Sequence, residues 1–515
     1  MEASVGRVES VRSEICIVTG LGGVGLSNVV AFSSGATGIV LGFEHQTAHV
    51  VMLEAYDQVK KGDLVRIVAP CPTIDVSKSL LGRVIDPLGR PLDGFGEIDS
   101  VNAVSLPIES KARPIYQRAL VDKPLQTGYV LVDSQIPIGL GQRELLLGER
   151  KSGQADIAID VICNQARLDT GLVCVYVAID AEVSVTKRNV ERLKQEGALD
   201  QTVVVFGRTA SAASLNYITP MVGMTIAEWF MSQGRNVLIV FDDLTRHAKV
   251  YRQLSLLLNR PASREAYPGD IFYLHSRLLE RCGAFNEHAG GGTITALPIV
   301  ETSTEEVTDY ITTNLMSITD GHVLFRRSLA NKGMRPPIDS GFSVSRIGGR
   351  IQPKFIRALS DQLKDTLTRF SEIERFIAFG TDLNGESLAI YELGLRARAL
   401  LDQTPDEYFT PLQQAMLLYF LTSKKALEWE ESQMKKLRKQ LFAFMAKAPY
   451  DKLLNPSLLT VHDEHSTHAF EECVKDFSKD ATTVKPISNE SRLVAETETI
   501  SGILKDNEDM FHDKA

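Results

Sequence analysis

The most specific chemistry-bearing segment of this sequence is a short run bounded by two glycines. An apolar run at 145–147 precedes it, and a helix-like stretch follows it. A strand, a glycine loop and a helix in this order form the frame of a P-loop, whose backbone N–H groups surround phosphates at a helix N-terminus. The residues of this glycine loop are Gly148, Glu149, Arg150, Lys151, Ser152, Gly153, Gln154 and Ala155. We therefore expect a nucleotide-binding loop by descent.

The two side chains that do the ionic work of a P-loop are missing from this loop. Gln154 stands at the lysine position, and Ala155 stands at the position of the Mg²⁺-binding hydroxyl. Losing two charge-assisted contacts removes roughly 3–6 kcal/mol of binding free energy, which is about two to four decades of affinity. We expect a weak or empty nucleotide site that has lost its Mg²⁺ position. Lys151 is an alternative cation, although it leaves the loop three residues earlier.

A second candidate is the apolar run 237–241, which ends in Asp242 and Asp243. A carboxylate at the carboxyl end of a buried strand fits a Walker-B position, where it helps to hold Mg²⁺. Either aspartate could instead cap the helix that follows. Because the glycine loop lies upstream, we favour a Walker-B-like role for Asp242.

A third candidate is the G-x-G-x-x-G run from Gly20 to Gly25, with Glu44 further along the chain. This spacing is found in dinucleotide-binding folds, where a helix begins at the third glycine. Here Gly35 and Gly38 break any helical pattern soon afterwards. Turns between short strands explain these glycines better than a dinucleotide site does.

Composition excludes several classes of function. The net charge of −9 disfavours a broad surface for nucleic-acid phosphates. No apolar run reaches the roughly 18 residues of a membrane span, and the N-terminus has no apolar core of a signal peptide. None of the six cysteines has C-x-x-C spacing, so we expect buried, reduced thiols.

The elements that must position these residues fall into four parts. Residues 1–71 predict a six-stranded-type β-barrel, because short β-branched runs alternate with glycine turns. Residues 72–357 alternate apolar strands with helices, which indicates a parallel α/β sheet around the glycine loop. Residues 358–478 have helical periodicity and predict an α-helical bundle. Residues 479–515 are rich in Ser, Thr, Asp and Glu and predict a disordered acidic tail. Expected helices include 184–195, 210–232, 358–379, 392–401, 411–421 and 424–446.

Several blocks of the sequence resemble the alpha subunits of F-type ATP synthases, and the likeness runs from about residue 5 to about residue 475. The blocks are 81–89, 126–128, 137–144, 255–258, 264–270, 274–281 and 336–346. The resemblance implies an N-terminal barrel, a central RecA-like P-loop domain and a C-terminal helical bundle. The blocks between 255 and 281 and the block 336–346 favour the alpha subunit over the catalytic beta subunit, whose typical acidic loop is also missing from the helical part.

The resemblance further implies a ring of three alpha and three beta chains around a rotating central stalk. Its partners would be a beta-type catalytic subunit, a gamma-type central-stalk subunit and, less definitely, a peripheral-stalk subunit. ATP or ADP with Mg²⁺ would react at the beta interface. Arg346 matches the arginine finger that alpha lends to that site, with Ser343 and Ser345 as interface support; the ordinary alternative is an interface ion pair.

This sequence departs from the family pattern at several positions. Ala181 stands where the beta subunit has its catalytic glutamate, and Glu182 is one residue out of register. The segment 403–411, near the family's adenine pocket, is longer than usual. Most of the family's N-terminal extension is missing, and the segment after about Lys479 is additional.

We therefore expect a non-catalytic, regulatory alpha-type subunit of a rotary ATP synthase that couples ion flow to ATP synthesis or hydrolysis. It would lie at the cytoplasmic side of a bacterial inner membrane, or at the matrix side in mitochondria, and touch the membrane only through the complex. The alternative is a structural alpha-like paralogue in a rotary assembly not coupled to proton flow. A self-sufficient hexameric secretion ATPase is disfavoured, because it needs the P-loop lysine and the catalytic glutamate in one chain.

Overall fold

The computed structural model describes residues 5–44, 46–303, 307–378 and 385–480. The predicted acidic tail lies, from residue 481 onward, outside the described residues. The described residues form two compact units. The first unit takes its members from 1–125, 138–327 and 343–347, and the second from 126–137, 328–342 and 348–515. The chain therefore leaves the first unit and returns to it twice, which differs from single cuts at 72 and 358.

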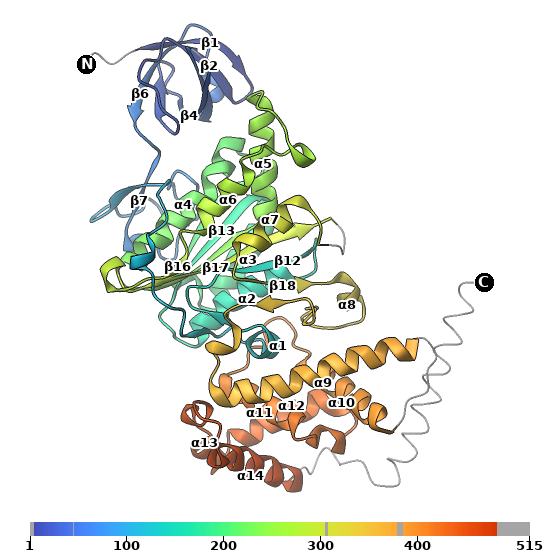
Figure 1. Ribbon diagram of the computed structural model, residues 1–515. Coiled ribbons are helices and arrows are strands. Elements are labelled where there is room, and N and C mark those ends of the chain that lie inside the picture. Colours follow the sequence, from blue (N-terminus) through green and yellow to red (C-terminus); the bar gives the residue numbers. More distant parts are fainter. Residues whose placement is uncertain (1–4, 45, 304–306, 379–384, 481–515) are drawn as a thin grey trace, which may run out of the picture. The chain divides into compact units, whose positions relative to one another are not determined.

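The first unit begins with a closed six-stranded barrel (Figure 1). Its strands are β1 (Gly6–Arg12), β2 (Ile15–Thr19), β3 (Val29–Phe32), β4 (Thr37–Glu44), β5 (Thr47–Glu54) and β6 (Leu64–Ala69), in the order β1-β2-β5-β4-β3-β6. Valine-rich strands place one side chain in two inside, so Val18, Val30 and Val50 are fully buried. Gly20 and Gly23, at φ +74° and +72°, form the turns after β2, and no helix follows them. The barrel explanation of the G-x-G-x-x-G run is confirmed.

A nine-stranded sheet forms the centre of the first unit. Its main path runs β19-β18-β12-β17-β15-β13-β14-β8, with β16 paired to β17. The strands are β8 (Val84–Ile85), β12 (Glu144–Glu149), β13 (Val173–Ala181), β14 (Thr202–Arg208), β15 (Asn236–Asp242), β16 (Gly283–Ala284), β17 (Thr293–Thr302), β18 (Gly321–Phe325) and β19 (Val344–Ser345). Every pair is parallel except those of β16 and β19. Because parallel strands are covered on both faces, the runs in β13 and β15 are apolar throughout.

Helices cover this sheet (Figure 1). They are α2 (Gln154–Arg167), α3 (Val183–Gln195), α4 (Ala213–Ser232), α5 (Leu244–Leu257), α6 (Ile271–Leu279) and α7 (Tyr310–Ile318). Helix α4 is buried on almost every side, and Gly223 leaves no space for a side chain because an added Cβ would lie 2.3 Å from Val177. Two short ladders complete the unit, namely β7 (Thr73–Val76) with β9 (Val104–Pro107) and β10 (Pro124–Leu125) with β11 (Ile138–Gly139).

The second unit is helical. Its helices include α1 (Val130–Gln135), α9 (Lys354–Ala378), α10 (Gly385–Leu401), α11 (Pro411–Thr422), α12 (Met434–Met445), α13 (Tyr450–Leu453) and α14 (Glu464–Asp480). Thr410 and Gln413 form a capping box that starts α11. Its apolar core gathers around the fully buried Trp429, against which Phe420 packs with ring centroids 5.5 Å apart.

One predicted helix is wrong in its first half. The stretch expected at 424–446 begins with two 3₁₀ turns, Lys425–Glu428 and Glu431–Gln433, and becomes an α-helix only at Met434. Lys424 is left-handed, with φ 59°, and Trp429 is extended, which turns its indole into the core. Burial of the tryptophan overrides the local helical periodicity.

The predicted fold class is confirmed: a six-stranded barrel, a central α/β sheet and a C-terminal helical domain are all present. Among the described helices, none combines the length and the apolar character needed to cross a membrane.

Candidate functional site

The glycine loop joins β12 to α2, as its spacing predicts. Gly153 has φ +103° and stands at the N-cap of α2, where the turn into the helix favours glycine. Gly148 has no space for a side chain, because an added Cβ would lie 2.5 Å from the Phe325 carbonyl oxygen and 2.9 Å from Ser152 Oγ. The strand, glycine turn and helix that the spacing predicts are therefore all present.

Hydrogen bonds inside the loop use the side chain at the lysine position. Gln154 Nε2 donates to the Glu149 carbonyl oxygen at 3.2 Å, and Ser152 Oγ donates to the same oxygen at 2.7 Å. Gln154 and Ser152 are both buried, whereas Arg150 and Lys151 are exposed. The Gln154 side chain is uncharged and hydrogen-bonds its own loop, so it offers no positive charge to a phosphate.

Asp242 ends β15 beside the loop, at the edge of the sheet where the carboxyl ends of the parallel strands meet. Tyr176 Oη donates to Asp242 Oδ2 at 2.6 Å, and Asn189 Nδ2 donates to Tyr176 Oη at 2.9 Å. Burial raises the pKa of Asp242. A carboxylate held by a buried phenol has given up one of the positions that a Mg²⁺-bound water would take.

Asp243, and not Asp242, caps the next helix. Its Oδ1 accepts from the backbone N–H groups of Thr245 and Arg246 at the start of α5. Of the two aspartates that could cap this helix, Asp243 is the one that does so. Burial, together with the nearby Glu301 and Asp242 carboxylates, raises the pKa of Asp243 to about 7.

A cation from the chain itself lies among these acids. The Arg246 Nε lies 3.5 Å from Asp243 Oδ2, and its Nη2 lies 3.9 Å from Glu301 Oε1. Arg246 Nη1 also donates to the Asp180 carbonyl oxygen at 3.2 Å. Among the described residues, no group of three His, Cys, Asp or Glu side chains could hold a metal ion.

The strand β13 ends at Ala181, the residue that the resemblance predicts at the position of the catalytic glutamate of a beta subunit. Ala181 is buried there and has no titratable group. Glu182 is exposed and stands at the N-cap position of α3 without a side-chain hydrogen bond to the helix. No carboxylate of this segment is therefore buried at the end of β13.

Arg346 lies far from the glycine loop within the same sheet. It directly follows β19, which runs antiparallel to β18 and pairs Gly321 with Ser345. Gly321 is the first residue of β18 and pairs with Glu144, the first residue of β12, whereas Gly148 stands near the end of β12. About 13 Å of strand separate the two ends. The structure thus brings Asp242 to the loop but places Arg346 at the opposite edge of the sheet.

Backbone contacts hold the Arg346 turn while its side chain is exposed. Its N–H donates to the Asp320 carbonyl oxygen at 3.0 Å, and its Nη1 donates to the Thr319 carbonyl oxygen at 3.4 Å. Ser343 Oγ accepts from the Leu324 N–H at 2.9 Å, and Ser345 Oγ accepts from Gln142 Nε2 at 3.0 Å. The two predicted support serines therefore bind the turn to the sheet.

In the second unit, the segment 403–411 is organised around buried polar groups. Gln403 Oε1 accepts from the Val130 N–H at 2.8 Å, and its Nε2 donates to the Gly128 carbonyl oxygen at 2.9 Å. Arg438 donates to Glu407 through Nη2 at 3.1 Å. The carboxamide of Gln403 is therefore used within its own unit.

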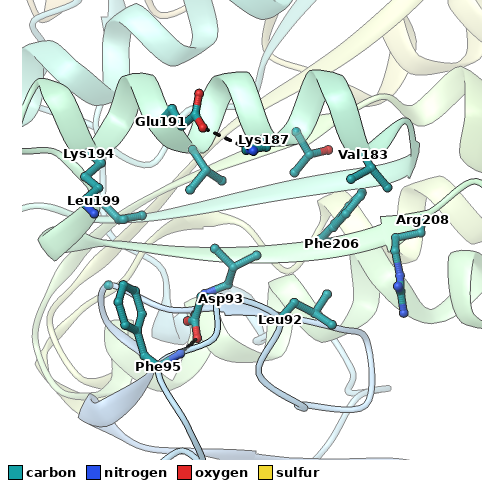
Figure 2. A pocket seen from close by; sticks show the side chains of 14 residues that line it. Leu92, Asp93, Phe95, Val183, Lys187, Glu191, Lys194, Leu199, Phe206 and Arg208 are labelled. Atoms are coloured by element: carbon teal, nitrogen blue, oxygen red, sulfur yellow. Dashed lines mark hydrogen bonds and ion pairs between the residues drawn. The ribbon is translucent and has the colours of Figure 1, made fainter.

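A separate cavity of about 440 Å³ lies between α3, β14 and the turn that follows β8 (Figure 2). Figure 2 shows Phe206 and Leu92 on its apolar wall, and Lys187 paired with Glu191 at 3.8 Å. None of the predicted site residues lines this cavity. It is therefore distinct from the glycine loop.

Sequence reasoning missed the polar residues behind Arg346 and around Asp242. Gln142 and Glu144 are fully buried although they precede an apolar strand, and Arg143 binds the Asp320 carboxylate through two nitrogens at 2.7 and 3.0 Å. Tyr176 sits within an all-apolar strand run. The one available signal was three polar residues directly before the strand 145–147.

Comparison with known proteins identifies the family. Residues 128–345 match the nucleotide-binding domain of the ATP synthase alpha/beta family, and residues 352–477 match the C-terminal domain of the ATP synthase alpha/beta chain. The ATP synthase subunit alpha of Staphylococcus haemolyticus (strain JCSC1435) is 43% identical over 418 residues, 81% of this chain and 82% of the relative. The subunit alpha of Staphylococcus aureus (strain JH9) gives the same identity and coverage.

The chain therefore belongs to the ATP synthase alpha/beta family. Within that family it is an alpha-type subunit, a class that is typically non-catalytic inside the ATP synthase complex. The resemblance stated from the sequence is confirmed.

Proposed function

We propose that this chain completes the catalytic site of a neighbouring beta-type subunit by placing Arg346 against the transferring phosphoryl group. The observation that carries this proposal is the position of Arg346, exposed and at the opposite sheet edge from the chain's own glycine loop. An arginine placed there is out of reach of its own loop but is available to a subunit that docks on this edge. In a ring of subunits with the same fold, each interface joins the same two surfaces, so this contact repeats around the ring and the ring closes.

The physical role of the arginine is charge stabilisation. A guanidinium presents a planar set of donors that matches the oxygens of a phosphoryl group and stays charged at all working pH values. Such fingers contribute about 10³–10⁵ in rate in phosphoryl transfer. The hydrogen bonds that the N–H and Nη1 groups of Arg346 donate support this role. They restrict the side chain before it binds, so less conformational entropy is lost on binding.

We further propose that the chain's own nucleotide site is weak. Gln154 bonds the loop carbonyl of Glu149, Asp242 is held by Tyr176, and Arg246 supplies a cation among the remaining acids. These residues do not fit a Mg²⁺-triphosphate, and we derive no chemical step at this loop. ATP or ADP with Mg²⁺ reacts instead at the beta interface.

In this proposal the partners are a beta-type subunit in an alternating hexamer and a gamma-type central stalk, with a peripheral-stalk contact of undefined form. The complex couples ion flow across a membrane to ATP synthesis or hydrolysis, and this chain stays peripheral, on the cytoplasmic side in a bacterium. A structural alpha-like paralogue in an uncoupled rotary assembly is the second candidate, which the altered glycine loop favours. Co-purification of membrane-ring subunits separates the two.

The test of the proposed function is Arg346→Ala in the complete complex. We expect multisite ATP turnover to fall by about 10³-fold or more while the hexamer stays assembled. Arg346→Lys recovers only part of the rate, because an ammonium lacks the planar fork. Arg350→Ala, at an exposed neighbouring arginine, serves as the matched control. Turnover of Arg346→Ala equal to that of the control rules the proposal out.

A further inference from the structure

A buried carboxylic acid lies directly behind the Arg346 turn. Glu144 has no exposed surface, and its Oε1 has no hydrogen-bond partner among the described residues. Its Oε2 accepts from Gln142 Nε2 at 2.6 Å. Burying an ionised carboxylate with one oxygen that accepts no hydrogen bond costs far more free energy than burying the neutral acid in the same place.

The backbone around this acid is built to hold it there. Glu144 pairs with Gly321 across β12 and β18, and Gly321 pairs with Ser345 across β18 and β19. A Cβ added to Gly321 would lie 2.5 Å from Glu144 Oε2 and 2.3 Å from the Val344 carbonyl oxygen. Only glycine at this position leaves room for the carboxyl group beside β19, the strand that Arg346 directly follows.

One amide links the acid to the turn. Gln142 Nε2 donates both to Glu144 Oε2 and to Ser345 Oγ at 3.0 Å, and Gln142 Oε1 accepts from the Gly139 N–H at 2.8 Å. The carboxamide is therefore fixed in orientation, and it joins Glu144 to the residue before Arg346.

Two other charged groups face this acid. The Asp320 carboxylate, at the start of β18, raises the pKa of Glu144, and the Arg346 guanidinium lowers it, although burial is the largest cause of the upward shift. Asp320 is already paired with Arg143. Because Arg143 is already paired with Asp320, Arg346 is the arginine that can pair with Glu144 if Glu144 ionises.

We propose that Glu144 is a positioning residue for Arg346: as a neutral acid it leaves the guanidinium available to the neighbouring subunit, and its ionisation draws the guanidinium inward. This inference rests on the proposed function, because it concerns how the same arginine is presented. Loss of the Glu144 proton to solvent is the only chemical step. Turnover of the complex must then decline on the alkaline side of its pH profile.

The test compares pH profiles of multisite turnover in complexes that carry wild type, Glu144→Gln or Glu191→Gln. The glutamine keeps the volume of the acid but cannot ionise, so the alkaline limb of Glu144→Gln should move upward by about one pH unit or more. At neutral pH, turnover of the Glu144→Gln complex should stay within about threefold of wild type, because the neutral amide replaces a neutral acid. Glu191→Gln, on α3 at the other side of the sheet, should reproduce the wild-type limb.

Two results overturn the inference. The first is an alkaline limb of the Glu144→Gln complex that coincides with that of wild type. The second is loss of turnover at neutral pH in an assembled Glu144→Gln complex, which would mean that the ionised form of Glu144 is required. If Glu144→Gln does not assemble, Ser345→Ala provides the test, because it removes the oxygen that Gln142 binds. We then expect kcat to fall about tenfold with KM unchanged, and an unchanged kcat contradicts the link.

Failure of this inference differs from failure of the proposed function. If Arg346→Ala abolishes turnover while Glu144→Gln leaves the profile unaltered, only the role of Glu144 is lost. If Arg346→Ala has no effect, the proposed function itself fails.

Discussion

The proposed weakness of the glycine loop as a triphosphate site rests first on two side chains. The backbone turn survives with Gly148 and Gly153 in place, and only Gln154 and Ala155 differ from the ionic pair of a P-loop. Backbone N–H groups alone favour an anion at a helix N-terminus, but they supply no net charge against a triphosphate.

Restoring both side chains should therefore restore binding. We predict that Gln154→Lys combined with Ala155→Thr tightens Mg-ATP binding to the purified chain by two or more decades, from the charge-assisted contacts regained at about 1.5–3 kcal/mol each. Titration of a fluorescent ATP analogue measures the change, with Lys151→Ala in the wild-type loop as the companion variant. An unchanged dissociation constant in the double variant would show that Arg246 and the Tyr176–Asp242 bond exclude the nucleotide by themselves.

At the residue scale, the sequence predicts the members of the loop and Arg346, because motif spacing and block resemblance carry them. It does not predict their partners. Tyr176 reads as one more apolar strand residue until the sheet places it against Asp242. Gln142 and Glu144 become informative only when β18 and β19 bring Gly321 and Ser345 across them.

At the scale of elements, helices α4, α5 and α6 share a buried pair of histidines. His247 Nδ1 lies 3.3 Å from His275 Nε2, and His247 Nε2 lies 3.0 Å from the Tyr217 carbonyl oxygen. Both rings are buried, and burial lowers the pKa of His247 from 6.5 to about 4 and that of His275 as well. The fold thus holds both rings neutral where an unfolded chain would charge them.

This pair predicts a loss of stability in acid. Above pH 6.5, His247 is neutral in both the folded and the unfolded chain. Between pH 6.5 and about 4, His247 is protonated in the unfolded chain but stays neutral in the folded chain. The free energy of unfolding therefore falls as the pH falls through this range. Each such histidine costs up to about 1.4 kcal/mol per pH unit in that window. Thermal melts of wild type and His247→Gln across this range measure it, with the glutamine keeping a donor for Tyr217. Melting temperatures of the two chains that fall in parallel would refute the prediction.

Strands and helices with strong periodicity are predictable because their burial pattern is written in consecutive residues. The short elements β8, β18 and β19 are not, since their pairing depends on segments distant in the chain. The helix expected from 424 fails for the same reason, because Trp429 finds its place in a core made by α10, α11 and α14. Long-range packing outweighs local propensity in these segments.

At the scale of the whole molecule, the path of the chain ties an early segment to a late one. Helix α1 belongs to the helical unit, where Val130 is fully buried and the Asp133 carboxylate accepts from Gln414 Nε2 at 2.7 Å. Gln352 Nε2 donates to the Asp133 carbonyl oxygen at 2.8 Å. The segment 126–137 therefore has several of its partners more than two hundred residues away.

Truncation after residue 347 should consequently fail to give a well-behaved protein. We predict that a chain of residues 1–347 aggregates, because α1 loses its apolar cover and the buried Asp133 carboxylate loses the bond from Gln414 Nε2. Size-exclusion chromatography with circular dichroism measures the outcome. Gln414→Ala in the full chain is the milder control, expected to lower stability by about 1–3 kcal/mol without aggregation. A monomeric, cooperatively melting 1–347 would contradict the prediction.

The same excursion constrains how this protein can be made. A ribosome releases α1 long before it has synthesised Gln352 or Gln414, so the nascent segment emerges with nothing to cover it. The helical unit that contains α1 cannot be completed until the helices from α9 to α14 have been synthesised. During that interval the apolar segment around Val130, which is fully buried in the folded protein, stays uncovered, and slower translation lengthens its exposure.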